Sequence, residues 1–198
     1  MAFNDFDLKT ACERFGLTVD ESAVLFSAVK SLDVPPRLRQ TLDVWAPVAL
    51  AMNTDKARSE MIIAPILMAA VELGPQPLRL FSGMTFDVDR EQGLNGPCDF
   101  LVTRSAVSYF ISHPVLSVFE AKKEDIPAGM GQCVAAMVAA RLFNEREKNG
   151  VRPIYGAVTT GSIWRFLKLE GKKVNIDRME YYLDHIGQIL GILVTLAA

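Results

Sequence analysis

The sequence predicts a mixed α/β domain, and three observations lead to this fold class. Half of the 198 residues are hydrophobic and 22% are charged, an ordinary globular composition with enough apolar residues for a core. Apolar residues recur at three- and four-residue spacing over the first 73 residues, as in helices. Short runs of bulky and β-branched residues then alternate with turn residues and two helical patterns, which is typical of a sheet covered by helices.

The N-terminal part is predicted to be helical. Helical spacing covers 8–15, 22–32 and 37–52, and a proline pair at 35–36 breaks the chain before the third helix. A longer helix is expected over 55–73, with a kink at Pro65 and an end at Gly74. We therefore divide the chain into a helical extension, 1–54, and a main domain, 55–198, which together form one compact unit.

The main domain is predicted to hold six strands and two more helices. Strands at 78–88, 99–103 and 115–121 follow one another over short connections, which favours an antiparallel meander. A helix from Ile126 to about Lys148 comes next. Three further strands, at 153–160, 162–169 and 174–176, precede a last helix from Met179 to about Leu196. The order predicts one mixed sheet with helices on it.

The charge of the chain excludes some partners and leaves others open. A net charge of −2 excludes the strongly basic composition of a histone-like nucleic-acid binder. The charge is uneven, because residues 120–178 carry eleven Lys and Arg against seven Asp and Glu, a local charge of +4. A basic segment attracts phosphate, although a solvated charged face fits the same count. The candidate contacts to a DNA backbone are Lys122, Lys123, Arg141, Arg165, Lys168, Lys172 and Lys173.

Cysteine usage and hydropathy indicate a cytoplasmic protein with no membrane segment. Cys12, Cys98 and Cys133 are too few and too scattered for a disulfide framework or a four-thiolate zinc site. The first residues lack the basic and apolar regions of a signal peptide. The most apolar stretches, 61–71 and 186–198, are shorter than the roughly 20 residues of a spanning helix. We expect both to be buried helices.

Charged side chains are predicted to meet at the ends of two neighbouring strands. Glu120 and Lys122 end an apolar strand and point to the same face, and Asp99 begins the strand before it. If the two strands pair as a hairpin, Asp99 and Glu120 are neighbours, and such carboxylates repel unless a cation lies between them. Oxygen ligands of this kind suit Mg²⁺ or Mn²⁺. Gln132 on the next helix and Glu60 on the helix before the sheet are candidates for the same cluster, and Glu60 would bind the metal directly or through water.

This ordered set of residues resembles the PD-(D/E)XK nuclease superfamily, whose fold is a restriction-endonuclease-like α/β/α core. The likeness is strongest over 118–125, Val-Phe-Glu-Ala-Lys-Lys-Glu-Asp, followed by Gly-Gln at 131–132. It continues through 155–161 and Trp164 and covers roughly 55–176. Small bacterial proteins of unassigned role and the N-terminal nuclease domains of restriction subunits are the most similar members. One departure is that Cys98 stands between Pro97 and Asp99, whereas the family's proline directly precedes its aspartate.

The resemblance implies a Mg²⁺-dependent nuclease that hydrolyses phosphodiester bonds in DNA. By position, Asp99 and Glu120 would be metal ligands, Lys122 the catalytic lysine, and Gln132 and Glu60 auxiliary residues, with Glu60 a further candidate ligand. The alternative is a catalytically silent module of the same fold that binds nucleic acid or protein in a defence or repair complex. A nucleotide-binding enzyme is disfavoured, because the sequence has no glycine-rich phosphate loop.

Simpler roles remain open for each of these residues. Glu120 and Lys122 also fit a same-face ion pair, and Asp99 also fits a cap of the turn before it. Gln132 and Glu60 also fit the solvated surface of a helix. Separately, Gly187 and Gly191 on the last helix would allow close packing in a homodimer.

Overall fold

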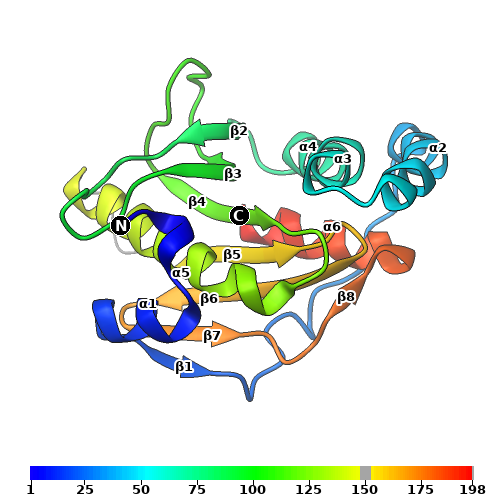
Figure 1. The fold of residues 1–198 in the computed structure, drawn as a ribbon. Helices are drawn as coiled ribbons and strands as arrows, with labels where there is room; N and C mark the ends of the chain where they lie inside the picture. The colour runs from blue at the N-terminus through cyan, green and yellow to red at the C-terminus, as the bar shows by residue number, and fades with distance from the viewer. Residues whose placement is uncertain (148–152, 198) are drawn as a thin grey trace.

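A mixed sheet lies at the centre of the fold, and helices cover both of its faces (Figure 1). The structure is a computed structural model that describes residues 1–147 and 153–197. The sheet has eight strands in the order β1-β7-β6-β5-β4-β3-β2, and β8 pairs with β6 beside this path. Parallel and antiparallel pairs both occur in it. The predicted mixed α/β class is therefore confirmed.

The strands follow the predicted order, with one added at each end. Their bounds are β1 Thr18–Asp20, β2 Arg79–Thr85, β3 Pro97–Thr103, β4 Val115–Ala121, β5 Ile154–Thr159, β6 Ile163–Glu170, β7 Lys173–Ile176 and β8 Tyr181–Tyr182. The strands β2, β3 and β4 form the expected antiparallel meander. A helix then crosses the sheet, so β5 runs parallel to β4. The edge strand β1 is an addition that the sequence patterns did not predict.

The α-helices lie before, between and after the strands. Their bounds are α1 Leu8–Phe15, α2 Pro36–Met52, α3 Asp55–Arg58, α4 Ala64–Leu73, α5 Ile126–Arg146 and α6 Ile186–Leu196. Between α3 and α4 the chain continues as a π-helical turn, Ser59–Ile63. This turn stands where a kink was predicted, because Pro65 has no N–H to donate back to the preceding turn. The predicted end of α5 at Lys148 lies outside the described residues.

The sheet separates two hydrophobic cores. One core lies under α1 and α5, and the other lies under α4 and α6. The N-terminal extension contributes to both, since Phe3 and Phe6 are buried in the first core and Phe26 and Leu38 in the second. Residues from the first 54 therefore pack against the main domain on both faces of the sheet.

The helix α5 is the central cover of one sheet face. Within 1–147 and 153–197 it is the one helix whose length and apolar composition match a membrane span, and 67% of that stretch is buried inside the fold. Four alanines at 135, 136, 139 and 140 are fully buried in it. These small side chains let the helix approach the strands closely, so we interpret α5 as a core helix.

Two predicted helical segments have a different structure. Residues 22–32 form turns and irregular chain, because their backbone is bonded to α6, where the Leu32 N–H donates to the Gly187 carbonyl oxygen at 2.9 Å. The last helix begins at Ile186 rather than Met179, since Tyr181 and Tyr182 pair with β6 instead. Tertiary contacts override helical spacing in both places.

The two glycines of α6 face the preceding segment of the same chain. A Cβ at Gly187 would lie 2.5 Å from the Leu32 carbonyl oxygen, and one at Gly191 would collide with the Lys30 carbonyl oxygen. Both glycines therefore hold the preceding segment against the helix. They do not offer the free surface that the predicted dimer contact needs.

Candidate functional site

The pairing of β3 with β4 brings Asp99 beside Glu120. Phe100 is aligned with Phe119 in this antiparallel pair, so the next position along each strand brings the two acids together. Asp99 also anchors the neighbouring backbone, because its Oδ2 accepts a hydrogen bond from the Ala121 N–H at 2.8 Å. The hairpin geometry expected from the sequence is thus present, and it places two carboxylates at one end of the sheet.

Glu120 is fully buried, and neither of its carboxylate oxygens has a hydrogen-bond donor among the described residues. Buried polar groups normally have partners, and a buried charge without one is costly. Burial and the adjacent Asp99 carboxylate raise the pKa of Glu120 well above its ordinary value, while Lys122 lowers it by a smaller amount. A cation between the two acids would offset their repulsion and give the Glu120 oxygens a partner. The two side chains therefore fit a divalent metal.

Lys122 lies in the loop after β4 and is held there by two contacts. Its backbone N–H donates to the Thr159 carbonyl oxygen at 2.8 Å, and its Nζ donates to the Gln132 Oε1 at 2.9 Å. Both side chains are half-buried. The structure therefore brings Asp99, Glu120, Lys122 and Gln132 together, and the Gln132 amide oxygen orients the lysine ammonium.

Two glycines in the first turns of α5 make this arrangement possible. A Cβ at Gly129 would lie 3.0 Å from two carbons of the Lys122 side chain and 2.6 Å from Val158 Cγ1. A Cβ at Gly131 would collide with the backbone of Phe6 and Asp7. The sequence contains Gly-Met-Gly-Gln at 129–132, but spacing alone does not reveal that the first glycine leaves room for a lysine.

The contact recorded for Glu60 is with Lys56 and not with the carboxylate pair. Its side chain is exposed on the π-helical turn, and Oε1 forms an ion pair with Lys56 Nζ at 2.8 Å. Across the part of the chain that the structure describes, no group of three His, Cys, Asp or Glu side chains could hold a metal. The protein thus offers two carboxylates, a ligand number that suits Mg²⁺, which usually keeps several waters.

A buried arginine links three segments next to the site. Arg58 donates to the Thr160 carbonyl oxygen at 2.7 Å and, through Nη2, to Asn53 Oδ1 at 3.0 Å. Asn53 in turn donates to Glu124 Oε1 at 2.7 Å, in the loop that carries Lys122. This network joins the end of α2, the β5–β6 turn and the β4–α5 loop. The sequence patterns did not predict this network.

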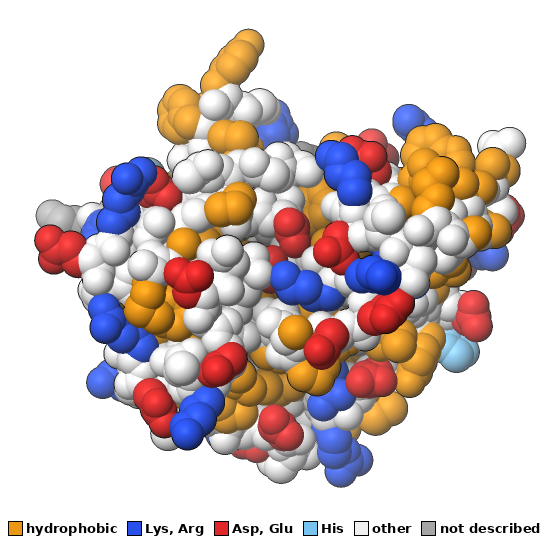
Figure 2. Space-filling view, viewed as in Figure 1, with side chains coloured by type: hydrophobic (Ala, Val, Ile, Leu, Met, Phe, Trp, Pro, Cys, Tyr) orange, Lys and Arg blue, Asp and Glu red, His pale blue; other side chains and the backbone are white. Residues whose placement is uncertain are grey.

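The basic residues proposed as phosphate contacts are mostly paired. Five of the seven form ion pairs, namely Lys123 with Glu124, Arg141 with Glu145, Arg165 with Glu180, Lys168 with Glu170 and Lys173 with Asp20. Such surface pairs are weak individually, yet they reduce the positive potential that a count of lysines and arginines suggests. Figure 2 shows acidic and basic side chains intermixed on the face that carries the start of α5.

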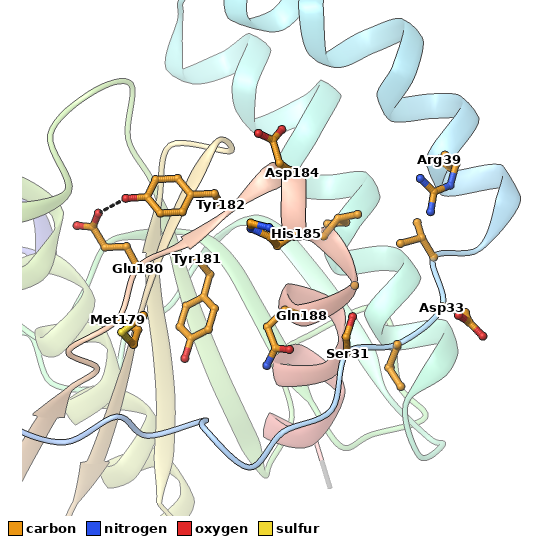
Figure 3. Close-up of a pocket in the computed structure, with 14 residues that line it drawn as sticks. Ser31, Asp33, Arg39, Met179, Glu180, Tyr181, Tyr182, Asp184, His185 and Gln188 are labelled. Carbon is orange, nitrogen blue, oxygen red and sulfur yellow. Dashed lines mark hydrogen bonds between the residues drawn. The ribbon is translucent and has the colours of Figure 1, made fainter.

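A separate cavity of about 590 Å³ lies between β8, the start of α6 and the segment before α2 (Figure 3). Charged side chains of both signs line it, namely Arg39, Asp33 and Asp184, together with His185. These four side chains are exposed to solvent, and none is held in an environment like that of Glu120. A functional site is marked by convergent groups with perturbed ionisation rather than by volume alone, so we place the site at the carboxylate pair.

Comparison with protein-family models and with curated proteins finds no match.

Proposed function

We propose that the protein is a Mg²⁺- or Mn²⁺-dependent nuclease that hydrolyses phosphodiester bonds in DNA in the cytoplasm. The observation that carries the proposal is Glu120, a fully buried carboxylate beside Asp99 whose oxygens have no donor among the described residues. A buried carboxylate without a hydrogen-bond donor lowers the stability of the fold, unless a bound ligand compensates its charge. The resemblance of the motif to PD-(D/E)XK nucleases implies that this ligand is a divalent cation and that the substrate is a phosphodiester.

Each residue would have a separate role in the reaction. Asp99 and Glu120 would hold the cation, which supplies Lewis acidity and a lowered pKa for an attacking water. Lys122, oriented by the Gln132 amide, would stabilise negative charge as it develops on the phosphate. The half-buried position of Lys122 keeps its charge close to the buried pair while leaving it accessible to substrate.

A cleavage assay with matched lysine variants tests the proposal. The protein is incubated with plasmid and linear DNA in Mg²⁺ or Mn²⁺, and product is followed with time. Lys122→Ala and Glu120→Gln should each lower the rate on the order of 100-fold or more. Lys9→Ala, which removes an exposed lysine of α1 outside the proposed site and DNA contacts, should leave the rate within a factor of a few. Undiminished cleavage by Lys122→Ala would contradict the assignment.

The second candidate is a catalytically silent binding module of the same fold. The pairing of five basic side chains with carboxylates favours it, because little free positive charge remains there for a DNA backbone. Calorimetry with Mn²⁺ separates the two functions. Binding that disappears in Asp99→Asn and Glu120→Gln supports the nuclease, whereas no binding by the wild type supports the module.

A further inference from the structure

The helix α2 has two apolar faces, of which only one is covered. Leu38, Leu42, Ala46 and Ala49 are buried against the rest of the fold. A second stripe lies beside them at helical spacing and consists of Val44, Trp45, Val48 and Met52, whose exposed fractions are 62%, 47%, 43% and 56%. A continuous exposed stripe of this kind marks an interaction surface rather than scattered apolar residues. Figure 2 shows hydrophobic side chains gathered over α2, at the upper right.

A groove borders the stripe where α2 meets α4. The cavity is about 210 Å³ in volume, and Trp45, Pro65 and Met68 contribute to its walls. Met68 is itself 47% exposed. The groove can take one large apolar side chain from outside, so the surface combines a ridge with a hollow, as self-complementary interfaces do.

The charges of α2 are arranged against the dipole of their own helix. Arg37 and Arg39 lie near its N-terminus, with no acidic residue in the first turn and no basic residue in the last. Cations are favourable near helix C-termini, where the free carbonyl groups carry partial negative charge. A second α2 packed antiparallel would place each Arg37 near the C-terminus of the other helix, which reverses the unfavourable arrangement.

We propose that α2 is the interface of a homodimer in which a second copy of the chain packs its own α2 antiparallel. A two-fold axis near Ala46 and Pro47 places Val44 of each copy opposite Val48 of the other, and Met52 beside the groove. The contact is isologous, as a closed dimer requires. The stripe Val44, Trp45, Val48 and Met52 carries no charge, so it does not suit a nucleic-acid backbone. The proposal does not depend on the nuclease activity.

The length of the surface sets the expected strength of the dimer. A helix of 17 residues is about 25 Å long, which gives an interface at the lower end of the range for specific complexes. We therefore expect a reversible dimer with a dissociation constant on the order of micromolar. Arg37 at the rim should make the association sensitive to salt.

Sedimentation of the full chain, from micromolar to millimolar concentration, tests the proposal. The wild type should pass from monomer to dimer, whereas Val48→Glu and Val44→Glu should stay monomeric over the whole range. Both positions are exposed, so these variants should keep the wild-type circular dichroism spectrum. The matched control is Leu50→Glu, the same chemical change on the opposite side of α2, which should dimerise like the wild type.

Fluorescence supplies a second measurement. The protein has two tryptophans, and Trp164 is fully buried whereas Trp45 is in the stripe. Emission should therefore shift to shorter wavelength as the protein is concentrated, and the shift should be absent in Val48→Glu. A wild type that stays monomeric at millimolar concentration overturns the proposal. So does a dimer that persists in both glutamate variants, because its interface would then lie elsewhere, and so does a partner of different sequence that binds α2 while the chain alone stays monomeric.

Discussion

Two fully buried carboxylates, Asp177 and Glu120, lie in the same sheet domain and have opposite surroundings. Asp177 follows β7, and its two oxygens accept hydrogen bonds from the Met179 N–H and the Tyr181 hydroxyl, each at 3.0 Å. Glu120 ends inside the fold without a donor from the described residues. Burial alone therefore does not distinguish the two acids. The difference is whether the fold itself completes the hydrogen bonds of the carboxylate.

Removal of Asp177 should have the largest effect on stability. Asp177→Ala leaves the Met179 N–H and the Tyr181 hydroxyl without their acceptor, so we expect the free energy of unfolding to fall by about 3 kcal/mol. Urea denaturation measures the change. Tyr181→Phe is the matched control, with a loss of about 1 kcal/mol. A smaller loss of unfolding free energy in Asp177→Ala than in Tyr181→Phe would contradict a structural role for the Asp177 carboxylate.

Replacement of Glu120 should instead raise the free energy of unfolding. In the presence of a chelator at neutral pH, Glu120→Gln should raise the free energy of unfolding by about 2 kcal/mol, because the neutral amide avoids the cost of burying or protonating the carboxylate and supplies a donor for Asp99. Thermal and urea unfolding at constant ionic strength give the value. Lower stability in the variant would show that the charged form of Glu120 is compensated within the fold.

The same variant gives a defined pH dependence. Because burial and Asp99 raise the pKa of Glu120 in the folded state above its ordinary value of 4.5, the folded protein keeps a proton that the unfolded chain releases. Stability of the metal-free wild type should therefore fall as pH rises from about 4.5 through the raised pKa. The difference in the free energy of unfolding between Glu120→Gln and the wild type should vanish below about pH 4.5 and grow as pH rises toward the raised pKa. A pH-independent difference would contradict the raised pKa.

Divalent cations should give the smallest of these effects and the most specific. A ligand that binds only the folded state at ten times its dissociation constant adds about 1.4 kcal/mol of stability. Mg²⁺ or Mn²⁺ should therefore raise the melting temperature of the wild type and leave Glu120→Gln unchanged. Tyr181→Phe, which keeps the site, should respond as the wild type does. Equal responses in all three proteins would place cation binding elsewhere.

The sequence predicts elements best where one physical signal dominates. Val115–Ala121 was predicted with its observed bounds, because a mainly apolar stretch with bulky and β-branched residues suits a strand buried on both faces. The segment 22–32 was predicted as a helix and is not one, since its backbone bonds to α6 instead. The pair Tyr181–Tyr182 was placed in a helix and pairs with β6. These errors arise from contacts between distant residues, which local spacing does not encode.

The candidate site divides in the same way. Asp99 and Glu120 were expected to be neighbours because hairpin geometry follows from strand order, and Gln132 was expected nearby from its place at the start of a helix. The contribution of Gly129 was not predicted, since the room that a glycine leaves depends on side chains from other elements. The position of Glu60 was not fixed by the sequence either, because a helical residue can face a site or solvent, and here it pairs with Lys56.

The close contact between Gly131 and the backbone of Phe6 and Asp7 has a consequence for the order of folding. The first turns of α5 can settle only after the chain has closed a loop of more than half its length, and such long-range closure is slow compared with local helix formation. Lys122 and Gln132 depend on those turns for their positions. We therefore expect the site to assemble late, after the sheet and its local hairpins have formed.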